Sequence, residues 1–219
     1  DRSTRARRLY EALDIYKRIH TEDRVTYKGE FTQIEDLHLS PKPVQQPHPP
    51  IWVGARGPKG IKRAAKAGHN FMATFGPDPA PLYRETLKEE GHNPDDFKIA
   101  QLRMGHIADS EDQAWDECQD HLFHLLEFYH DILEGANDAE GDDAPLPVKE
   151  PRDIRDSVLK DVFLVGTADQ VAEKLDAFWN EFICTDFVMD MQLPGMDVAT
   201  CNRAIERFAK EVMPAFRDR

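Results

Sequence analysis

From residue 51 onward, short apolar runs that favour β-strands alternate with longer segments that favour helices. This alternation constrains the fold more than any other feature of the sequence. Strands are expected over residues 51–53, 71–75, 98–108 and 186–191. Strands that alternate with helices predict βαβ units joined by right-handed crossovers, and hence a mainly parallel sheet. The expected fold class is therefore α/β.

The helices between these strands are marked by their periodicity and by their ends. They are expected over residues 61–67, 82–90, 111–132, 170–182 and 198–213. Gly68 and Gly91 provide C-terminal stops for the first two, and Gly166-Thr-Ala-Asp169 provides a capped start for the fourth. Upstream, we expect an amphipathic helix over 4–20 and two extended pieces around Gly29. Five prolines then occupy residues 40–50 and predict an extended connector.

Length and composition indicate a soluble protein that forms one domain over residues 1–219. The 219 residues are 40% hydrophobic, which is enough for a substantial core. No apolar stretch reaches the length of a membrane span, and the sequence shows no signal peptide. The three cysteines are far apart, which argues against a disulfide framework and a zinc cluster. We therefore expect reduced thiols, no metal site, a cytoplasmic location and no membrane partner.

The net charge of −13 is concentrated in one region of the chain. Residues 109–156 hold 16 acidic and 3 basic side chains, whereas residues 1–66 hold 14 basic and 8 acidic ones. No helix carries a basic stripe with aromatic residues between the charges, so no nucleic-acid partner is expected. A small anionic ligand bound near the basic segment is expected rather than a nucleic-acid duplex. Residues 135–150 are acidic and contain Gly and Pro, and we interpret them as a flexible insertion.

The strongest chemical signal is the run Gly54-Ala-Arg-Gly-Pro-Lys-Gly60, which lies between an expected strand and an expected helix. Unpaired N–H groups at a helix N-terminus attract phosphate, and glycines let the backbone come close to it. Gly54, Ala55, Arg56, Gly57 and Gly60 are the candidate cofactor-binding residues, with Lys59 as an additional point charge. The alternative is that the glycines only make a tight strand-to-helix turn.

Four segments, in order, resemble the luciferase-like flavin-dependent monooxygenase family (the bacterial luciferase superfamily). They are Leu39-Ser-Pro-Lys-Pro-Val-Gln-Gln-Pro-His-Pro-Pro-Ile-Trp-Val-Gly-Ala55, Arg63-Ala-Ala-Lys-Ala-Gly68, Val165-Gly-Thr-Ala-Asp-Gln-Val171 and Phe208-Ala-Lys-Glu-Val-Met-Pro-Ala-Phe216. The resemblance implies a (β/α)₈ TIM barrel of which this chain supplies roughly the C-terminal four β/α units. The four expected strands would then be the fifth to the eighth of the barrel.

The same resemblance implies an enzyme that uses reduced FMN and dioxygen to oxidise a small organic substrate, with a flavin reductase as the electron source. A deazaflavin that transfers hydride is the related alternative. In the family, hydroxyl and acidic side chains of the phosphate loop help to hold the flavin; here Arg56, Gly57 and Gly60 stand in those places. The usual catalytic histidine belongs to the half of the barrel that this chain does not match, so the catalytic residues stay unknown.

Two other readings of the whole chain stay open. A non-catalytic half-barrel would serve as a binding or assembly module, and its unpaired strand edges would favour a homo-oligomer, most simply a dimer. A sugar-phosphate enzyme that shares only the phosphate loop is the third alternative.

Several further residues carry weaker signals. Trp52 is expected to pack in the core. His106 is expected to be structural, although either it or Arg103 would reach a pocket from the strand over 98–108. His121, His124 and Glu127 are expected to lie on a solvated helix face rather than bind a metal. Gln192, Leu193 and Met196 either line a pocket or belong to a turn.

Overall fold

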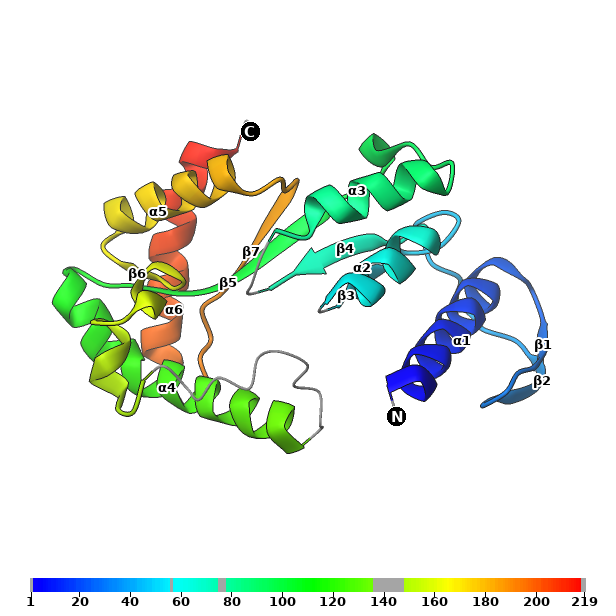
Figure 1. The fold of residues 1–219 in the computed structure, drawn as a ribbon, viewed down its shortest axis with the longest axis horizontal. Helices are drawn as coiled ribbons and strands as arrows, with labels where there is room; N and C mark the ends of the chain where they lie inside the picture. Colours follow the sequence, from blue (N-terminus) through cyan, green and yellow to red (C-terminus); the bar gives the residue numbers. More distant parts are fainter. Residues whose placement is uncertain (1, 56, 75–77, 136–147, 218–219) are drawn as a thin grey trace. The chain divides into compact units, whose positions relative to one another are not determined.

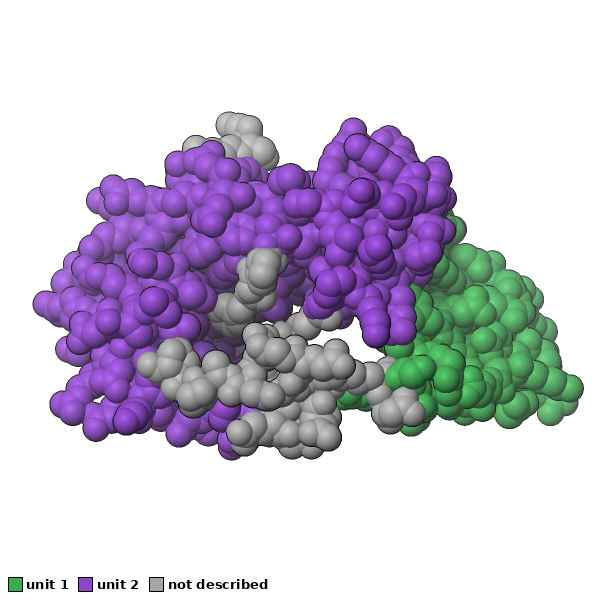
Figure 2. Space-filling view, viewed as in Figure 1, with its two compact units in different colours: residues 1–51 green, residues 52–219 purple. Residues whose placement is uncertain are grey.

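The computed structural model describes residues 2–55, 57–74, 78–135 and 148–217. Within these residues the chain separates into two compact units, Asp1–Ile51 and Trp52–Arg219, which Figure 2 shows in different colours. The predicted acidic insertion lies almost entirely outside the described residues, as does the candidate site residue Arg56. The prediction of one domain over 1–219 stays a prediction.

The first unit is a helix followed by a β-hairpin. Helix α1 (Arg2–Thr21) precedes strands β1 (Val25–Lys28) and β2 (Gln33–Leu37), which pair antiparallel. The carboxylate of Glu11 on α1 accepts hydrogen bonds from the backbone N–H groups of Glu30 (2.8 Å) and Phe31 (3.1 Å). A β-carbon on Gly29 would come within 2.5 Å of that carboxylate and of the Tyr27 ring, so glycine lets these side chains lie close to the turn. The predicted helix and extended pieces are confirmed.

The second unit alternates strands and helices, as Figure 1 shows. Its elements are β3 (Trp52–Gly54), α2 (Gly57–Lys66), β4 (Asn70–Ala73), α3 (Ala80–Glu89), β5 (Ile99–Ile107), α4 (Glu111–Gly135), β6 (Leu164–Gly166), α5 (Ala168–Glu181), β7 (Asp186–Asp190) and α6 (Val198–Arg207). All pairings among these strands are parallel. The predicted α/β class is confirmed, and each of the four expected strands is present.

Strand β5 is the centre of the sheet. It pairs with β4, with β7 and, through its last three residues, with β6. Every residue of β5 except Leu102 is buried. Burial on both faces is typical of central parallel strands. Strand β6 was not predicted, because its three residues are too few to produce a periodic signal.

One face of the sheet packs against helices α3 and α5. Residues that are register partners in a parallel sheet share a face. One face carries Phe71, whose ring lies 5.5 Å from that of Tyr83 on α3, and Arg103, whose guanidinium lies 4.9 Å from the ring of Phe178 on α5. This face is therefore the one against which α3 and α5 pack.

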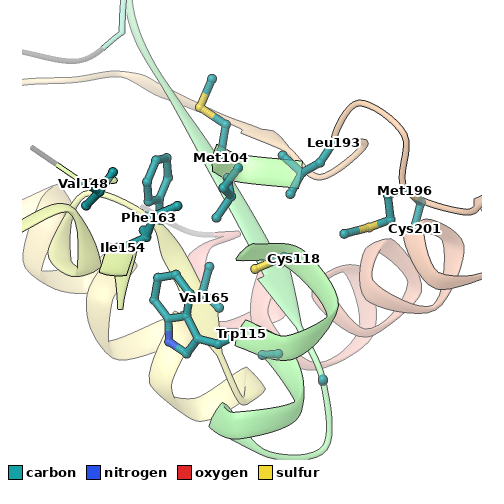
Figure 3. Close-up of a cluster of buried hydrophobic side chains, with 13 residues drawn as sticks. Met104, Trp115, Cys118, Val148, Ile154, Phe163, Val165, Leu193, Met196 and Cys201 are labelled. Atoms are coloured by element: carbon teal, nitrogen blue, oxygen red, sulfur yellow. The ribbon is translucent and has the colours of Figure 1, made fainter. Parts of the chain in front are cut away.

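Helix α4 contributes to a hydrophobic cluster around the carboxyl-terminal half of β5 (Figure 3). Its buried members include Met104, Trp115, Cys118, Leu122, Val148, Ile154, Phe163, Val165, Leu193, Met196 and Cys201. They come from β5, α4, β6, α6 and the loops around them, so the cluster joins segments that are far apart in the sequence. Each large side chain buried in this way stabilises the unit by roughly 1.5–3 kcal/mol.

The last helix differs from its prediction. Instead of one helix over residues 198–213, α6 ends at Arg207 and continues as a π-helical turn (Phe208–Val212) and a 3₁₀ turn (Met213–Phe216). Pro214 has no N–H group and cannot continue an α-helix, which accounts for the end of regular structure there.

The N-terminus of α5 has a capping box, and the helix begins two residues before the expected start at residue 170. The hydroxyl of Thr167 accepts from the N–H of Gln170 (3.3 Å), and the side-chain carbonyl of Gln170 accepts from the N–H of Thr167 (2.9 Å). The reciprocal bonds satisfy two N–H groups that a helix start leaves unpaired.

We expect Thr167→Ala to lower the free energy of unfolding by about 1 kcal/mol, because it removes the capping hydroxyl. Thr167→Ser keeps the hydroxyl and is expected to stay within a few tenths of a kcal/mol of the native chain. Urea unfolding of the three proteins measures both differences. Equal losses in the two variants would show that the hydroxyl does not act as a cap.

Candidate functional site

The carboxyl ends of parallel strands meet at one edge of a sheet, where α/β proteins place their ligands. At this edge β3 passes directly into α2. The helix begins at Gly57, four residues earlier than predicted, so Gly57 and Gly60 lie in its first turn rather than in a loop before it. Pro58 explains the difference. Proline usually indicates the end of a helix, but it is tolerated in the first helical turn, where no N–H group is needed.

Gly57 and Gly60 are glycines for different reasons. Gly57 has φ of +75°, and a β-carbon there would meet no atom within 4 Å. A β-carbon on Gly60 would lie 2.6 Å from that of Ala55. Gly60 therefore permits close packing of the turn, whereas Gly57 adopts a left-handed backbone conformation that favours glycine. Gly54, the last residue of β3, is exposed.

The start of α2 is electrostatically positive. Its first turn holds no acidic residue, and Lys59, Lys62, Arg63 and Lys66 are its four charged side chains. Of these, Lys66 is bound by Glu90 at 2.6 Å, whereas the exposed Lys59 and Lys62 form no ion pair with any described residue. The unpaired N–H groups of the first turn add the partial positive charge of the helix dipole. This arrangement can bind a small anion such as a phosphate group.

Arg103 fixes the neighbouring strand end instead of reaching a pocket. Its side chain is 2% exposed and stacks on Phe178 and Phe182 of the α5 segment. One guanidinium nitrogen donates to the backbone carbonyls of Thr74 (2.6 Å) and Leu102 (2.8 Å). Arg103 thereby holds the chain just beyond β4 at the same edge of the sheet. The sequence signal for this role is an arginine inside an otherwise apolar strand.

His106 is structural, in agreement with the prediction. It is fully buried, and its Nε2 lies 2.7 Å from the carboxylate of Glu117 on α4. Burial acts to raise the pKa of Glu117, but hydrogen bonds from His106 and Gln113 outweigh that effect and lower it overall. Arg203 of α6 lies 4.0 Å from the same carboxylate. Glu117 thus links α4 to both β5 and α6.

The segment after β7 is a packed turn. Leu193 and Met196 are 2% and 9% exposed and belong to the cluster in Figure 3, so they are core residues, whereas Gln192 is exposed and lines a pocket between β7 and α6. On α4, His121 Nδ1 lies 2.8 Å from the carbonyl oxygen of Pro194 and ties this turn to the helix. The described residues contain no group of three or more His, Cys, Asp or Glu side chains that could hold a metal ion.

Trp52 is half-buried at the start of β3, next to the buried Val53.

No helix within the described residues is both long enough and apolar enough to cross a membrane.

A family model described as luciferase-like monooxygenase matches residues 1–185. The chain belongs to the luciferase-like monooxygenase family. The resemblance inferred from the sequence is therefore confirmed. Among curated relatives of this luciferase-like chain, the oxygenase component of a flavin-dependent trigonelline monooxygenase from Acinetobacter baylyi is 28% identical over 96% of the chain and 60% of its own length. An F420-dependent glucose-6-phosphate dehydrogenase from Kineococcus radiotolerans is 40% identical over 36% of the chain and 23% of its own length.

Solved structures show the same fold. Monooxygenase RslO1 from Streptomyces bottropensis superposes with a TM-score of 0.74 at 21% identity, over 94% of this chain and 60% of that one. The oxygenating constituent of 3,6-diketocamphane monooxygenase from Pseudomonas putida was solved in complex with FMN. It superposes with a TM-score of 0.68 at 21% identity, over 94% of this chain and 62% of that one. These relatives are TIM barrels, and this luciferase-like chain spans about 60% of their length. Its sheet is therefore part of such a barrel.

The pKa of Glu117 predicts a pH-dependent contribution to stability. Because the pKa is lowered in the folded chain, the contribution is present at neutral pH and is lost as the pH falls through the ordinary glutamate range, about 4.3, and below. We expect Glu117→Gln to lower the free energy of unfolding by about 1–3 kcal/mol at pH 7 and by progressively less in acid.

Glu127→Gln on the exposed face of the same helix is the matched control, and it is expected to change little at any pH. Urea unfolding between pH 3 and pH 7 provides the measurement. A deficit in Glu117→Gln that stays constant with pH would rule out the charged carboxylate as its cause.

Proposed function

We propose that this chain is part of a flavin-dependent monooxygenase that holds the phosphate of FMN at the N-terminus of α2. The observation that carries the proposal is the acid-free first turn of α2, where, among the described residues, Lys59 is unpaired and no atom lies within 4 Å of a β-carbon on Gly57. The family supports it, since relatives include a protein named as a flavin-dependent monooxygenase and a barrel solved with FMN.

The residues present fit a phosphate group. The backbone N–H groups of Gly57 and Lys59 belong to the first helical turn, where no carbonyl of the helix can accept from them. Pro58 has no N–H, so its place among them removes no donor that the helix needs. Lys59 adds positive charge, and Arg56, as the sequence suggests, would add a bidentate donor. Charge-assisted bonds of this kind are about twice as strong as neutral ones.

Within such an enzyme, bound reduced FMN supplies the electrons with which dioxygen oxidises a small organic substrate, and a flavin reductase would reduce the FMN. The contribution of this chain is to bind and orient. α2 anchors the phosphate, Arg103 holds the end of β4, and α4 packs against the turns that follow β5 and β7. All three cysteines are free, as expected of a reducing compartment such as the cytoplasm.

A deazaflavin-dependent hydride transfer is the second candidate. It is favoured by local matches to F420-dependent glucose-6-phosphate dehydrogenases, which reach 40% identity over 80 residues. Binding assays with FMN and with coenzyme F420 in parallel discriminate between the two, because the cofactor of the native enzyme is expected to bind more tightly.

We expect Lys59→Glu to weaken FMN binding about three- to tenfold, because it replaces an attractive charge by a repulsive one beside the phosphate. Flavin fluorescence titration measures the affinity. An acidic residue in the first turn favours the helix, so the fold is expected to persist.

Lys62→Glu changes the net charge equally but lies three residues further along α2, and it is expected to have a smaller effect. Riboflavin, which lacks the phosphate, is expected to bind both variants like the native chain. If Lys59→Glu weakened the binding of riboflavin and of FMN equally, or weakened the binding of neither, the phosphate would not lie at α2.

A further inference from the structure

Arg103 is a charged residue on the central strand of the sheet. Its side chain is 2% exposed, and the strands on both sides of β5 belong to the described part of the chain. Removing a guanidinium group from water is costly, and an apolar residue of similar size is often at least as stable in such a place. An arginine at this position therefore indicates a role that an apolar side chain cannot fill.

The guanidinium group joins two strands at the point where their pairing ends. Among the described residues, the last register pair of β4 and β5 is Ala73↔Gln101. Just beyond this pair, Nη1 of the guanidinium donates to the carbonyl of Thr74, which follows β4, and to that of Leu102 on β5, at 2.6 and 2.8 Å. One donor nitrogen thereby connects the two chains where the ladder no longer does.

Two aromatic rings hold the guanidinium group in this place. Its central carbon lies 4.9 Å from the ring centroid of Phe178 and 5.4 Å from that of Phe182, both at the C-terminal end of α5. Cation–π contacts stabilise a desolvated guanidinium and restrict its orientation. The donor nitrogen is therefore fixed by α5 against the ends of the two strands.

The end of β4 that Arg103 holds is next to the proposed phosphate site. Strands β3, β4 and β5 lie side by side in this order (Figure 1). The last pair of β3 with β4 is Gly54↔Met72, and a β-carbon on Gly54 would lie 3.7 Å from the carbonyl oxygen of Met72. Because α2 begins at Gly57, directly after this junction, a shift of the β4 end would move the N-terminus of α2 as well.

We propose that Arg103 is a positioning residue for the phosphate site. It holds the end of β4, β4 holds the end of β3, and β3 sets the place of the first turn of α2. This inference rests on the proposed function, because it concerns the turn at which the phosphate is proposed to bind. Binding groups have to stay within about 0.5 Å of their productive geometry, so a loosened β4 end is expected to lower the affinity for a phosphate.

Arg103→Met tests the proposal in the full chain. Methionine keeps a long side chain against Phe178 and Phe182 but has no N–H group to donate. Flavin fluorescence titration is expected to show FMN binding weakened about five- to twentyfold and riboflavin binding changed less than about twofold. Circular dichroism checks that the variant is folded, and Arg103→Leu replaces it should the methionine variant fail to fold.

Arg103→Lys is the conservative variant. Its ammonium group can donate to the carbonyl of Thr74, but it lacks the planar fork that stacks on two rings. It is expected to recover part of the lost affinity and to bind FMN about two- to fourfold more weakly than the native chain. A folded lysine variant that bound FMN as weakly as Arg103→Met would overturn the role of the hydrogen-bond donor.

Thr167→Ala is the matched control for a loss of stability. It removes a cap at the other end of α5, away from Phe178 and Phe182, and is expected to bind FMN like the native chain. An equal loss of FMN affinity in Thr167→Ala and in Arg103→Met would overturn the proposal, because general destabilisation would then account for both.

The outcomes separate this inference from the proposed function. A native chain that bound FMN no more tightly than riboflavin would refute the phosphate site itself, and the inference with it. A native chain that preferred FMN, together with a folded Arg103→Met variant that bound FMN equally well, would refute only the positioning role of Arg103.

Discussion

The pairing of β5 with three parallel strands is the interaction on which the second unit depends. β5 lies against β4 and β7 through its first half and against β6 through its last three residues. A strand that is paired on both edges and buried on both faces is expected to be mostly apolar. β5 follows this pattern except at Gln101, Arg103 and His106. Each of the latter two is bonded to a specific partner: Arg103 holds the segment after β4, and His106 holds α4. Arg103 and His106 therefore hold the segment after β4 and helix α4 in place, while the apolar residues of β5 form the core.

The sequence predicts the strands well because each is a run of apolar residues bounded by Gly, Pro or charged residues, and these signals are local. The features it could not predict depend on contacts between distant segments. β6 is only three residues long and is a strand because β5 extends past β4 to meet it. The side of β5 on which Arg103 lies is set by the aromatic rings of α5, some 75 residues later in the chain. The burial of Leu193 and Met196 requires α4, which no local pattern places over that turn.

Much the same division holds for the proposed phosphate site. The glycine spacing after β3 points to the strand-to-helix junction on which the proposal rests, since glycine is needed where a backbone turns sharply or approaches a ligand. The sequence does not distinguish Gly60, which is constrained by the β-carbon of Ala55, from Gly57, whose φ of +75° favours glycine whatever the surrounding space. Both glycines therefore serve the fold of the junction. The proposed binding face is the N-terminal end of α2, where Lys59 lies.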